Sequence, residues 1–116
     1  MSETPISSDL IRGHIDTILL GLLSAQDRYG YDICKQVTLL SDEEYELKGP
    51  TLYSAARRLE GQGFVRSYWG EGPQGARRKY YAITPEGSKA YQRNLEDWKR
   101  AQRLIDRLVS GETEKE

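Results

Sequence analysis

The stretch GPTLYSAARRLEGQGFVRS, residues 49–67, decides the fold of this chain. It carries an apolar stripe at helical spacing, made of Leu52, Tyr53, Ala56 and Leu59. Pro50 suits the first turn of a helix, where its missing N–H costs nothing. Gly63 can adopt the left-handed conformation that ends a helix, which lets Phe64 fold back toward Leu59. The stretch therefore predicts a helix followed directly by a strand.

The other face of this predicted helix is slim and positively charged. Small side chains come from Thr51, Ser54 and Ala55, and Arg57 and Arg58 add two cations. A helix that enters the DNA major groove, roughly 12 Å wide, must be slim at the base edges and positive near the phosphates. An isolated arginine pair would be typical of any solvated helix. The interpretation as a DNA-contacting face therefore depends on a second basic cluster further along the chain.

That second cluster, Arg77, Arg78 and Lys79, follows a glycine-rich stretch between two β-rich runs, 64–69 and 77–83. Residues 48–82 contain seven basic and two acidic residues, whereas the rest of the chain has ten basic and sixteen acidic ones. A basic segment in a chain of net charge −1 is the electrostatic footprint of a nucleic-acid binder. We therefore predict DNA contacts at Lys48, Thr51, Ser54, Ala55, Arg57, Arg58, Arg77, Arg78 and Lys79.

The remaining patterns predict helices on both sides of this segment. A first helix begins at residue 8 or 9, and its apolar face is Ile11, Ile15, Ile18, Leu19, Leu22 and Leu23. A turn at 27–30 precedes a second helix, which points Ile33, Cys34, Val37 and Leu40 to one side; an acidic loop at 41–46 and a short strand at 45–47 follow. Thr84 caps a last helix that has Pro85 in its first turn.

Three helices, a two-stranded hairpin and a long helix form the plan of a winged helix-turn-helix, a mainly α fold of the α+β kind. We divide the chain into a flexible arm at 1–8, a winged-helix domain at 9–84, a dimerisation helix at 85–109 and a disordered tail at 110–116. The last helix would run roughly 37 Å at 1.5 Å per residue, longer than a small head can cover. Its stripe of Tyr91, Trp98 and Ile105 therefore needs a partner surface.

Composition argues against several other classes of protein. With one histidine, His14, and one cysteine, Cys34, no pattern places a nucleophile beside a base. No metal-ligand spacing and no phosphate-cradling glycine loop before a helix is present, so we expect neither enzymatic activity nor a cofactor. The single cysteine, the lack of an apolar run of ~18 residues and the lack of a charged leader favour a cytoplasmic protein without membrane contact.

Several motifs, in order, resemble the PadR family of bacterial transcription regulators: IRGHIDTILLGLL, YGYDICKQV, LKGPTLYSAARRLEGQGFV, SYWGEGPQGARRKYYAIT and the helix around LEDWKR. The resemblance spans residues 10–108. Within this family the chain is most similar to the short, multidrug-responsive LmrR-like branch. The similarity rests on SYWG, RRKYY and a tryptophan midway along the last helix. The resemblance implies a homodimer in which the last helix packs on the partner's first helix.

In that branch, planar aromatic and often cationic compounds bind in a pore between two equivalent tryptophans. The resemblance implies that Trp98 stacks on the ligand, with walls from Leu95, Gln102, Leu10, Asp16 and Thr17. Gln102 departs from the acidic residue that would favour cations, so charge selection would fall to Asp16. Lys48 stands where a capping Asn or Ser is common before the recognition helix. The missing cap lowers the stability of that helix by ~1 kcal/mol, and the lysine adds a cation that can contact a phosphate.

We therefore expect a dimeric repressor of a multidrug efflux or detoxification gene, bound to double-stranded operator DNA and relieved by planar aromatic ligands. Two other interpretations stay open. The chain could be a PadR-type regulator that responds to phenolic compounds, or one that has no small-molecule effector; in the latter case aromatic dyes leave Trp98 fluorescence unchanged. It could also be a winged-helix module that binds an acidic protein, in which case its affinity for duplex DNA is not salt-sensitive.

Overall fold

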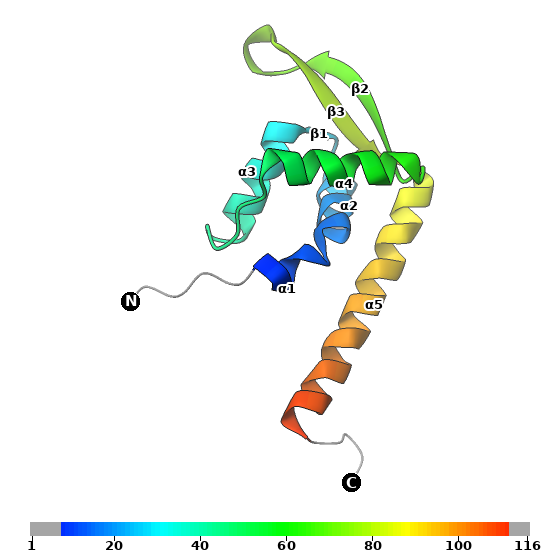
Figure 1. The fold of residues 1–116 in the computed structure, drawn as a ribbon. Helices are drawn as coiled ribbons and strands as arrows, with labels where there is room; N and C mark the ends of the chain where they lie inside the picture. The colour runs from blue at the N-terminus through cyan, green and yellow to red at the C-terminus, as the bar shows by residue number, and fades with distance from the viewer. Residues whose placement is uncertain (1–7, 112–116) are drawn as a thin grey trace.

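The computed structural model describes residues 8–111, in which the shorter helices and a small sheet form a head and one long helix extends away from it (Figure 1). The elements in chain order are α1 (Ser8–Arg12), α2 (Ile15–Ala25), β1 (Arg28–Tyr29), α3 (Gly30–Leu40), α4 (Gly49–Gly61), β2 (Val65–Glu71), the 3-10 turn η1 (Pro73–Gly75), β3 (Arg77–Ile83) and α5 (Pro85–Ser110). The predicted arm at 1–8 and tail at 110–116 lie outside the described residues except at their inner ends, where residue 8 starts α1 and α5 continues through residue 110.

The predicted first helix is broken into two pieces at Gly13 and His14. Glycine is about 1 kcal/mol less favourable than alanine inside a helix, which makes this the weakest point of the run. The backbone N–H of His14 donates to the Ile11 carbonyl at 2.8 Å, which closes α1 before α2 begins. The break lets α1 turn away from the axis of α2, so Leu10 is exposed instead of packing with the core of the head.

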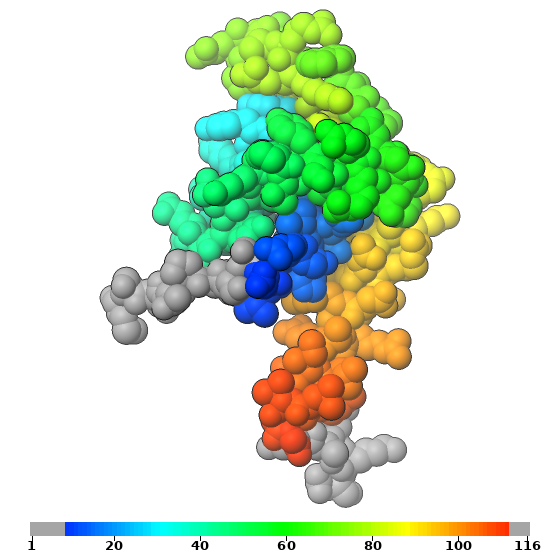
Figure 2. Space-filling view, in the orientation of Figure 1, coloured from blue at the N-terminus to red at the C-terminus, as the bar shows by residue number. Residues whose placement is uncertain are grey.

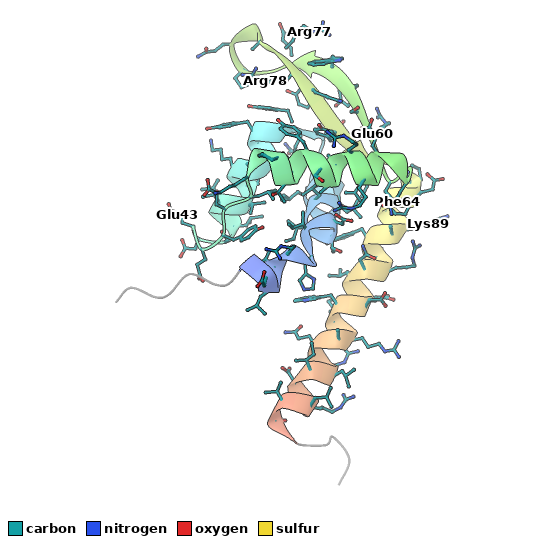
Figure 3. The ribbon with its side chains drawn as sticks, viewed as in Figure 1. Glu43, Glu60, Phe64, Arg77, Arg78 and Lys89 are labelled. Carbon is teal, nitrogen blue, oxygen red and sulfur yellow. The ribbon has the colours of Figure 1, made fainter. Side chains whose placement is uncertain are left out.

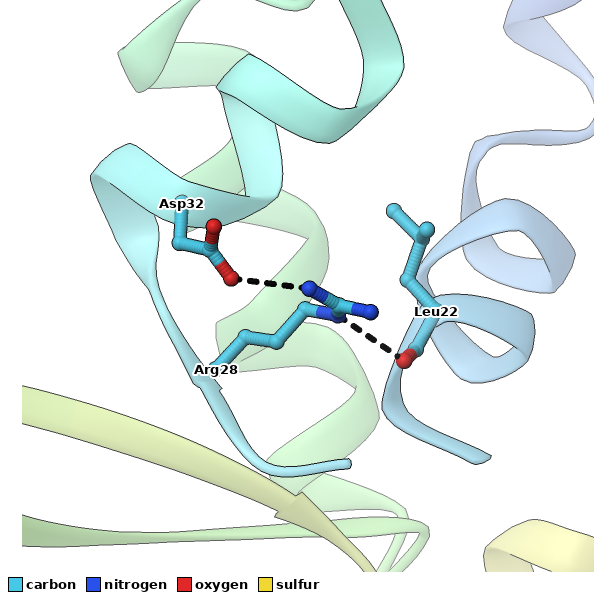
Figure 4. Close-up of polar contacts among 3 residues, drawn as sticks. All are labelled: Leu22, Arg28 and Asp32. Carbon is cyan, nitrogen blue, oxygen red and sulfur yellow. Dashed lines mark hydrogen bonds and ion pairs between the residues drawn. The ribbon is translucent and has the colours of Figure 1, made fainter. Parts of the chain in front are cut away.

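A third strand lies where the sequence predicted only a turn. β1 pairs antiparallel with β3, with Arg28 opposite Tyr81, and the sheet order is β1-β3-β2. Arg28 braces this crossing: its Nε donates to the Leu22 carbonyl at 3.1 Å, and its Nη1 contacts Asp32 at 2.9 Å (Figure 4). A two-residue strand is too short to leave a periodic signal, so tertiary pairing alone creates it.

The hairpin and the caps on either side of it confirm the local predictions. β2 and β3 pair in register from Val65 opposite Ile83 to Glu71 opposite Arg77. Gly63 has φ +79°, and the N–H of Phe64 donates to the Leu59 carbonyl at 3.0 Å. The Thr84 hydroxyl accepts from the N–H of Gly87 at 3.0 Å and so caps α5. Turn and cap chemistry is local, which is why the sequence alone predicts it.

The core lies where α2, α3 and α4 meet the base of the sheet. Its largest fully buried side chains are Leu19, Leu20, Ile33, Leu52 and Leu59. Three predictions about the interior were wrong: Tyr53 and Leu40 are exposed, and residues 45–47 form no strand, although Leu47 is buried against the core. The winged helix-turn-helix architecture itself is confirmed.

Among residues 8–111, no helix has both the length and the apolar character needed to cross a membrane.

Candidate nucleic-acid interface and apolar pocket

α4 lies across one face of the head as an open ridge below the hairpin (Figure 2). Thr51, Ser54 and Arg57 are exposed on it. Ala55 is not: it is 1% exposed and belongs to the core. The prediction that Ala55 meets DNA is therefore wrong, because one α-helical turn is 3.6 residues and Ala55 follows Leu52 by three, on the buried side.

Lys48 precedes α4 and, as predicted, supplies no side-chain cap to it. Its exposed side chain borders a cleft of about 550 Å³ between α4 and the α1–α2 corner. Thr51 and Ser54 line the same cleft from α4, and Arg12 lines it from α1. The small residues and Lys48 thus share one surface with a basic residue from α1 that the sequence did not single out.

Arg58 lies on the side of α4 that faces α2. Its Nη2 lies 2.5 Å from Asp16 Oδ1, and its Nε donates to Asp16 Oδ2 at 3.2 Å. The pair is partly open to solvent, with the two side chains 51% and 33% exposed. Two residues predicted for separate sites, one for DNA and one for a ligand, are therefore bound to each other.

The β2–β3 hairpin, residues 65–83, is the wing of this fold. The three basic residues predicted to contact DNA from it are all exposed on β3. The Arg77 guanidinium lies 5.5 Å from the centre of the Trp69 ring, Arg78 lies 5.7 Å from that of Tyr29, and Lys79 Nζ lies 6.0 Å from that of Tyr81. Figure 3 shows Arg77 and Arg78 toward the far end of the hairpin. A cation over an aromatic face keeps N–H groups directed to solvent, which suits contact with a phosphate backbone.

A corner rich in tyrosine between α4 and β3 was missed by the sequence interpretation. Tyr53 of α4 and Tyr81 of β3 meet there, and Tyr29 and Tyr31 border it from β1 and α3. Burial is the main cause that raises the pKa of Tyr81; Tyr53 and Glu60 add to the effect, and Arg57 opposes it. The one available signal was composition, because the chain has eight tyrosines and one phenylalanine.

A second, apolar pocket of about 470 Å³ lies between α1, α2 and α5. It brings together four of the predicted ligand residues, Leu10, Thr17, Leu95 and Trp98. The Trp98 ring meets His14 edge-on, with 6.2 Å between the ring centres. At Gly21, an added Cβ would lie 3.1 Å from the Tyr91 ring, so glycine lets Tyr91 close one end of the pocket.

Two of the three polar residues predicted for this pocket, Asp16 and Gln102, lie elsewhere. Asp16 borders an adjoining shallow pocket together with His14, Asp97 and Trp98, and it is held by Arg58. Gln102 is exposed on α5, one turn beyond Trp98, and is not among the residues that line either pocket. Within this single chain, the aromatic wall and its apolar neighbours are thus assembled without Gln102.

Groups that could carry other chemistry are sparse in the part of the chain that the structure describes. Within residues 8–111, no three histidine, cysteine, aspartate or glutamate side chains are grouped so that they could hold a metal ion. Cys34 is half-buried on α3, and its pKa is raised mainly by burial, with Glu46 adding to the effect. A raised pKa keeps the thiol protonated and weakly nucleophilic.

Comparison with known proteins places this arrangement in a family. Residues 19–93 match the transcriptional regulator PadR-like family. A solved transcriptional regulator from Clostridium thermocellum is 49% identical, with a TM-score of 0.81 over 90% of this chain and 98% of that one. A PadR family transcription regulator from hypervirulent Clostridium difficile is 32% identical, with a TM-score of 0.73 over 84% of this chain and 99% of that one.

A Lysinibacillus sphaericus protein that bears the name uncharacterized protein X is 35% identical over 106 residues, 91% of this chain and 97% of its own length. The family match covers more than half of the chain and includes α3, α4 and the whole hairpin. Together with the basic surface of α4 and β3, these similarities establish that the chain belongs to the PadR-like family of transcriptional regulators, which act by binding DNA.

Proposed function

We propose that this chain is a cytoplasmic homodimeric repressor of a multidrug efflux or detoxification gene, released from its operator by planar aromatic compounds that bind beside Trp98. In this proposal each protomer places α4 in a major groove and lays its wing along the flanking backbone. The half-sites lie about one helical turn apart, ~34 Å, or a small multiple of it.

The DNA-binding half of the proposal is supported by which cations are free to act. Arg57, Arg78 and Lys79 are exposed, and none of them forms an ion pair within the described residues. Arginine and lysine in such positions bind phosphates and orient the protein, while base edges are read by small and polar side chains such as Thr51 and Ser54. If about six cations per dimer neutralise phosphates, the log–log salt slope is near −5.

The observation that carries the proposed dimer is the apolar face of α5. Tyr91 and Leu95 pack toward α2, and the same face continues through Trp98, Ile105 and Val109, since residues seven apart differ by only about 20° around a helix. Beyond Trp98 this face is bare, and Val109 is 81% exposed. Figure 2 shows the end of α5 standing clear of the head. A second copy of the chain supplies the missing cover.

The ligand half rests on the pocket at the root of that face. Trp98 is 42% exposed, so its ring is available to a stacking partner. An open, largely apolar pocket with an aromatic wall is suited to flat hydrophobic compounds. The pocket lies between α2, which belongs to the head, and α5, the proposed dimerisation helix. A ligand bound there can therefore alter the angle between the heads of the two protomers. Ligand and operator then weaken each other by equal free energies, typically about 1–3 kcal/mol.

The test combines mass, fluorescence and DNA binding. Light scattering on the purified chain is expected to give twice the monomer mass, and Ile105→Glu is expected to give a monomer. Trp98 fluorescence is expected to be quenched by planar compounds. The quenching is expected to weaken in the presence of the duplex DNA that lies upstream of the gene for this chain, called the upstream fragment below. A monomer at micromolar concentration would refute the dimer. Quenching by no compound in a panel of positive, neutral and negative charge would favour a regulator without an aromatic effector.

A further inference from the structure

The tyrosine corner between the wing and α4 forms a concave site of its own. It encloses about 450 Å³ and is lined by side chains of four elements, β1, α3, α4 and β3: Tyr29, Tyr31, Tyr53, Arg78, Lys79 and Tyr81. We call it the tyrosine pocket. No acidic side chain lines it, whereas two cations do. Its chemistry is therefore that of an anion site, and it lies between α4 and the wing.

The tyrosine hydroxyls of this pocket have no hydrogen-bond partner in the part of the chain that the structure describes. The hydroxyls of Tyr29, Tyr31 and Tyr53 make no hydrogen bond to another group of residues 8–111, and Tyr31 and Tyr53 are 69% and 48% exposed. The neighbouring wing tyrosines differ. Tyr68 donates to Asp27, and Tyr80 donates to the Glu71 carbonyl at 2.9 Å.

The local fold determines where these tyrosines lie around the pocket. An added Cβ at Gly30 would lie 2.6 Å from the Tyr53 hydroxyl oxygen, so the glycine is what admits Tyr53 over the start of α3. Arg28 of the preceding strand is bound to Leu22 and Asp32 (Figure 4). These contacts hold β1 in place and so help to position Tyr29 and Tyr31, which flank Gly30 in the sequence. The tyrosines are thus positioned by the close approach of Tyr53 to Gly30 and by the contacts of Arg28, and not by hydrogen bonds to one another.

The two cations of the pocket are held by aromatic rings and leave their charge uncompensated. Arg78 lies over Tyr29 and Lys79 lies over Tyr81, and neither forms an ion pair within residues 8–111. A tyrosine ring supports a cation through its face without neutralising it, as a carboxylate would. The pocket therefore combines neutral O–H donors with charged N–H donors, the combination that proteins use for phosphate oxygens.

We propose that the tyrosine pocket binds a phosphodiester group of the DNA backbone, at the edge of the major groove that α4 enters. Tyr31 and Tyr53 donate to its free oxygens, and Arg78 and Lys79 offset its charge. The inference rests on the proposed operator binding and deepens it, because it adds the pocket's tyrosines to the interface and gives them a sequence-independent role. Phosphate contacts set the register of the protein on the duplex but do not read bases.

The test removes single hydroxyl groups and keeps the rings. Tyr31→Phe and Tyr53→Phe are compared with Tyr80→Phe, whose hydroxyl serves the wing internally. The probes are the chain's own upstream fragment and a scrambled duplex of equal length, each titrated over a range of salt. Tyr31→Phe and Tyr53→Phe are each expected to weaken binding of the proposed dimer about 25-fold on both duplexes alike, because each removes one hydrogen bond, an effect of about fivefold, from each of the two protomers. Tyr80→Phe is expected to bind as the parent does.

Salt dependence separates the neutral donors from the charged ones. The phenylalanine variants are expected to keep the parental slope, because a hydroxyl releases no counterion, whereas Lys79→Ala is expected to flatten it by about 0.9 for each phosphate that is no longer neutralised. If the parent binds neither duplex, the proposed function itself fails. If the parent binds and both phenylalanine variants match it, only the tyrosine pocket is refuted.

Two further outcomes would overturn the assignment to backbone phosphate. A weakening confined to the upstream fragment would mean that the tyrosines read bases. Inorganic phosphate that binds to the parent but not to Tyr31→Phe, while both proteins bind the scrambled duplex equally, would mean a site for free phosphate. Thermal unfolding of each variant within a few degrees of the parent is the check that loss of binding is not loss of fold.

Discussion

Arg58 of α4 and Asp16 at the start of α2 form an ion pair with two contacts, which joins α4, the helix proposed to enter the major groove, to α2, which borders the apolar pocket. Both contacts use the same carboxylate, and Asp16 also borders the shallow pocket beside Trp98. In the proposed complexes, a DNA phosphate and Asp16 compete for the Arg58 guanidinium, and a ligand cation and Arg58 compete for the Asp16 carboxylate. The pair is a physical connection between the two proposed sites.

Asp16→Asn is expected to strengthen binding to the upstream fragment by two- to fivefold at low salt, because Arg58 no longer has to leave a carboxylate to reach a phosphate. The stability change is expected to stay below about 1 kcal/mol, since the pair is partly exposed. Binding isotherms for Asp16→Asn, Arg58→Ala and the double variant measure this. Equal affinity of Asp16→Asn and the parent would show that Arg58 stays on α2 in the complex.

Arg57→Ala is expected to cost more DNA affinity than Arg58→Ala. Arg57 is exposed and forms no ion pair within the described residues, so its charge is fully available to a phosphate, whereas Arg58 must first give up Asp16. Removing one phosphate-binding cation per protomer is expected to reduce the salt slope of a dimer by about 2. The comparison needs both variants at several salt concentrations. A larger effect of Arg58→Ala would reverse the assignment of the two arginines.

Trp98→Ala is expected to abolish quenching and binding of planar dyes while leaving operator affinity without ligand within about threefold of the parent. The residue lines the apolar pocket on α5, far along the chain from α4, so its removal takes away the stacking wall and leaves the residues proposed to contact DNA in place. Dye fluorescence anisotropy and gel shifts measure the two properties. Trp69→Ala, on the wing, is the matched control and is expected to keep dye binding.

Two glycine-to-alanine changes are expected to have opposite effects on stability. At Gly87 an added Cβ would lie 2.0 Å from the Phe64 carbonyl oxygen, so Gly87→Ala forces α5 off the base of the hairpin and is expected to cost about 3 kcal/mol or more. At Gly61 nothing lies within 4 Å, and the alanine is expected to add about 0.5–1 kcal/mol to α4. Urea unfolding of both variants checks this, and equal midpoints would contradict it.

Cys34 is expected to react slowly with a disulfide reagent, because burial raises the pKa of its thiol and the thiolate is the reacting form. With the pKa raised, the thiolate fraction is lower at any pH below it, so the rise of the reaction rate with pH is displaced to higher pH than in a short peptide. Stopped-flow absorbance from pH 7 to pH 10 measures the profile. Reaction of the folded chain at the rate of the urea-unfolded chain would contradict it.

Those elements that depend on neighbouring residues could be predicted from the sequence. The end of α4 at Gly63, the cap at Thr84 and the β2–β3 hairpin all follow from chemistry within a few residues. The wing cations were also placed correctly on an exposed strand. Tyr53 was misplaced because an aromatic residue beside an apolar stripe fits either side of the stripe's edge by periodicity alone.

What the sequence by itself determined is the order of the helices and the hairpin, their local ends, and the concentration of positive charge on residues 48–82, since each depends on short-range spacing. Only the tertiary structure decided that Ala55 is buried, that Arg58 turns to Asp16, and that tyrosines from four elements surround one pocket. These arrangements join residues as many as 52 positions apart, as in Tyr29 and Tyr81, and they exist only once α2, α3, α4 and the sheet have packed around a common core.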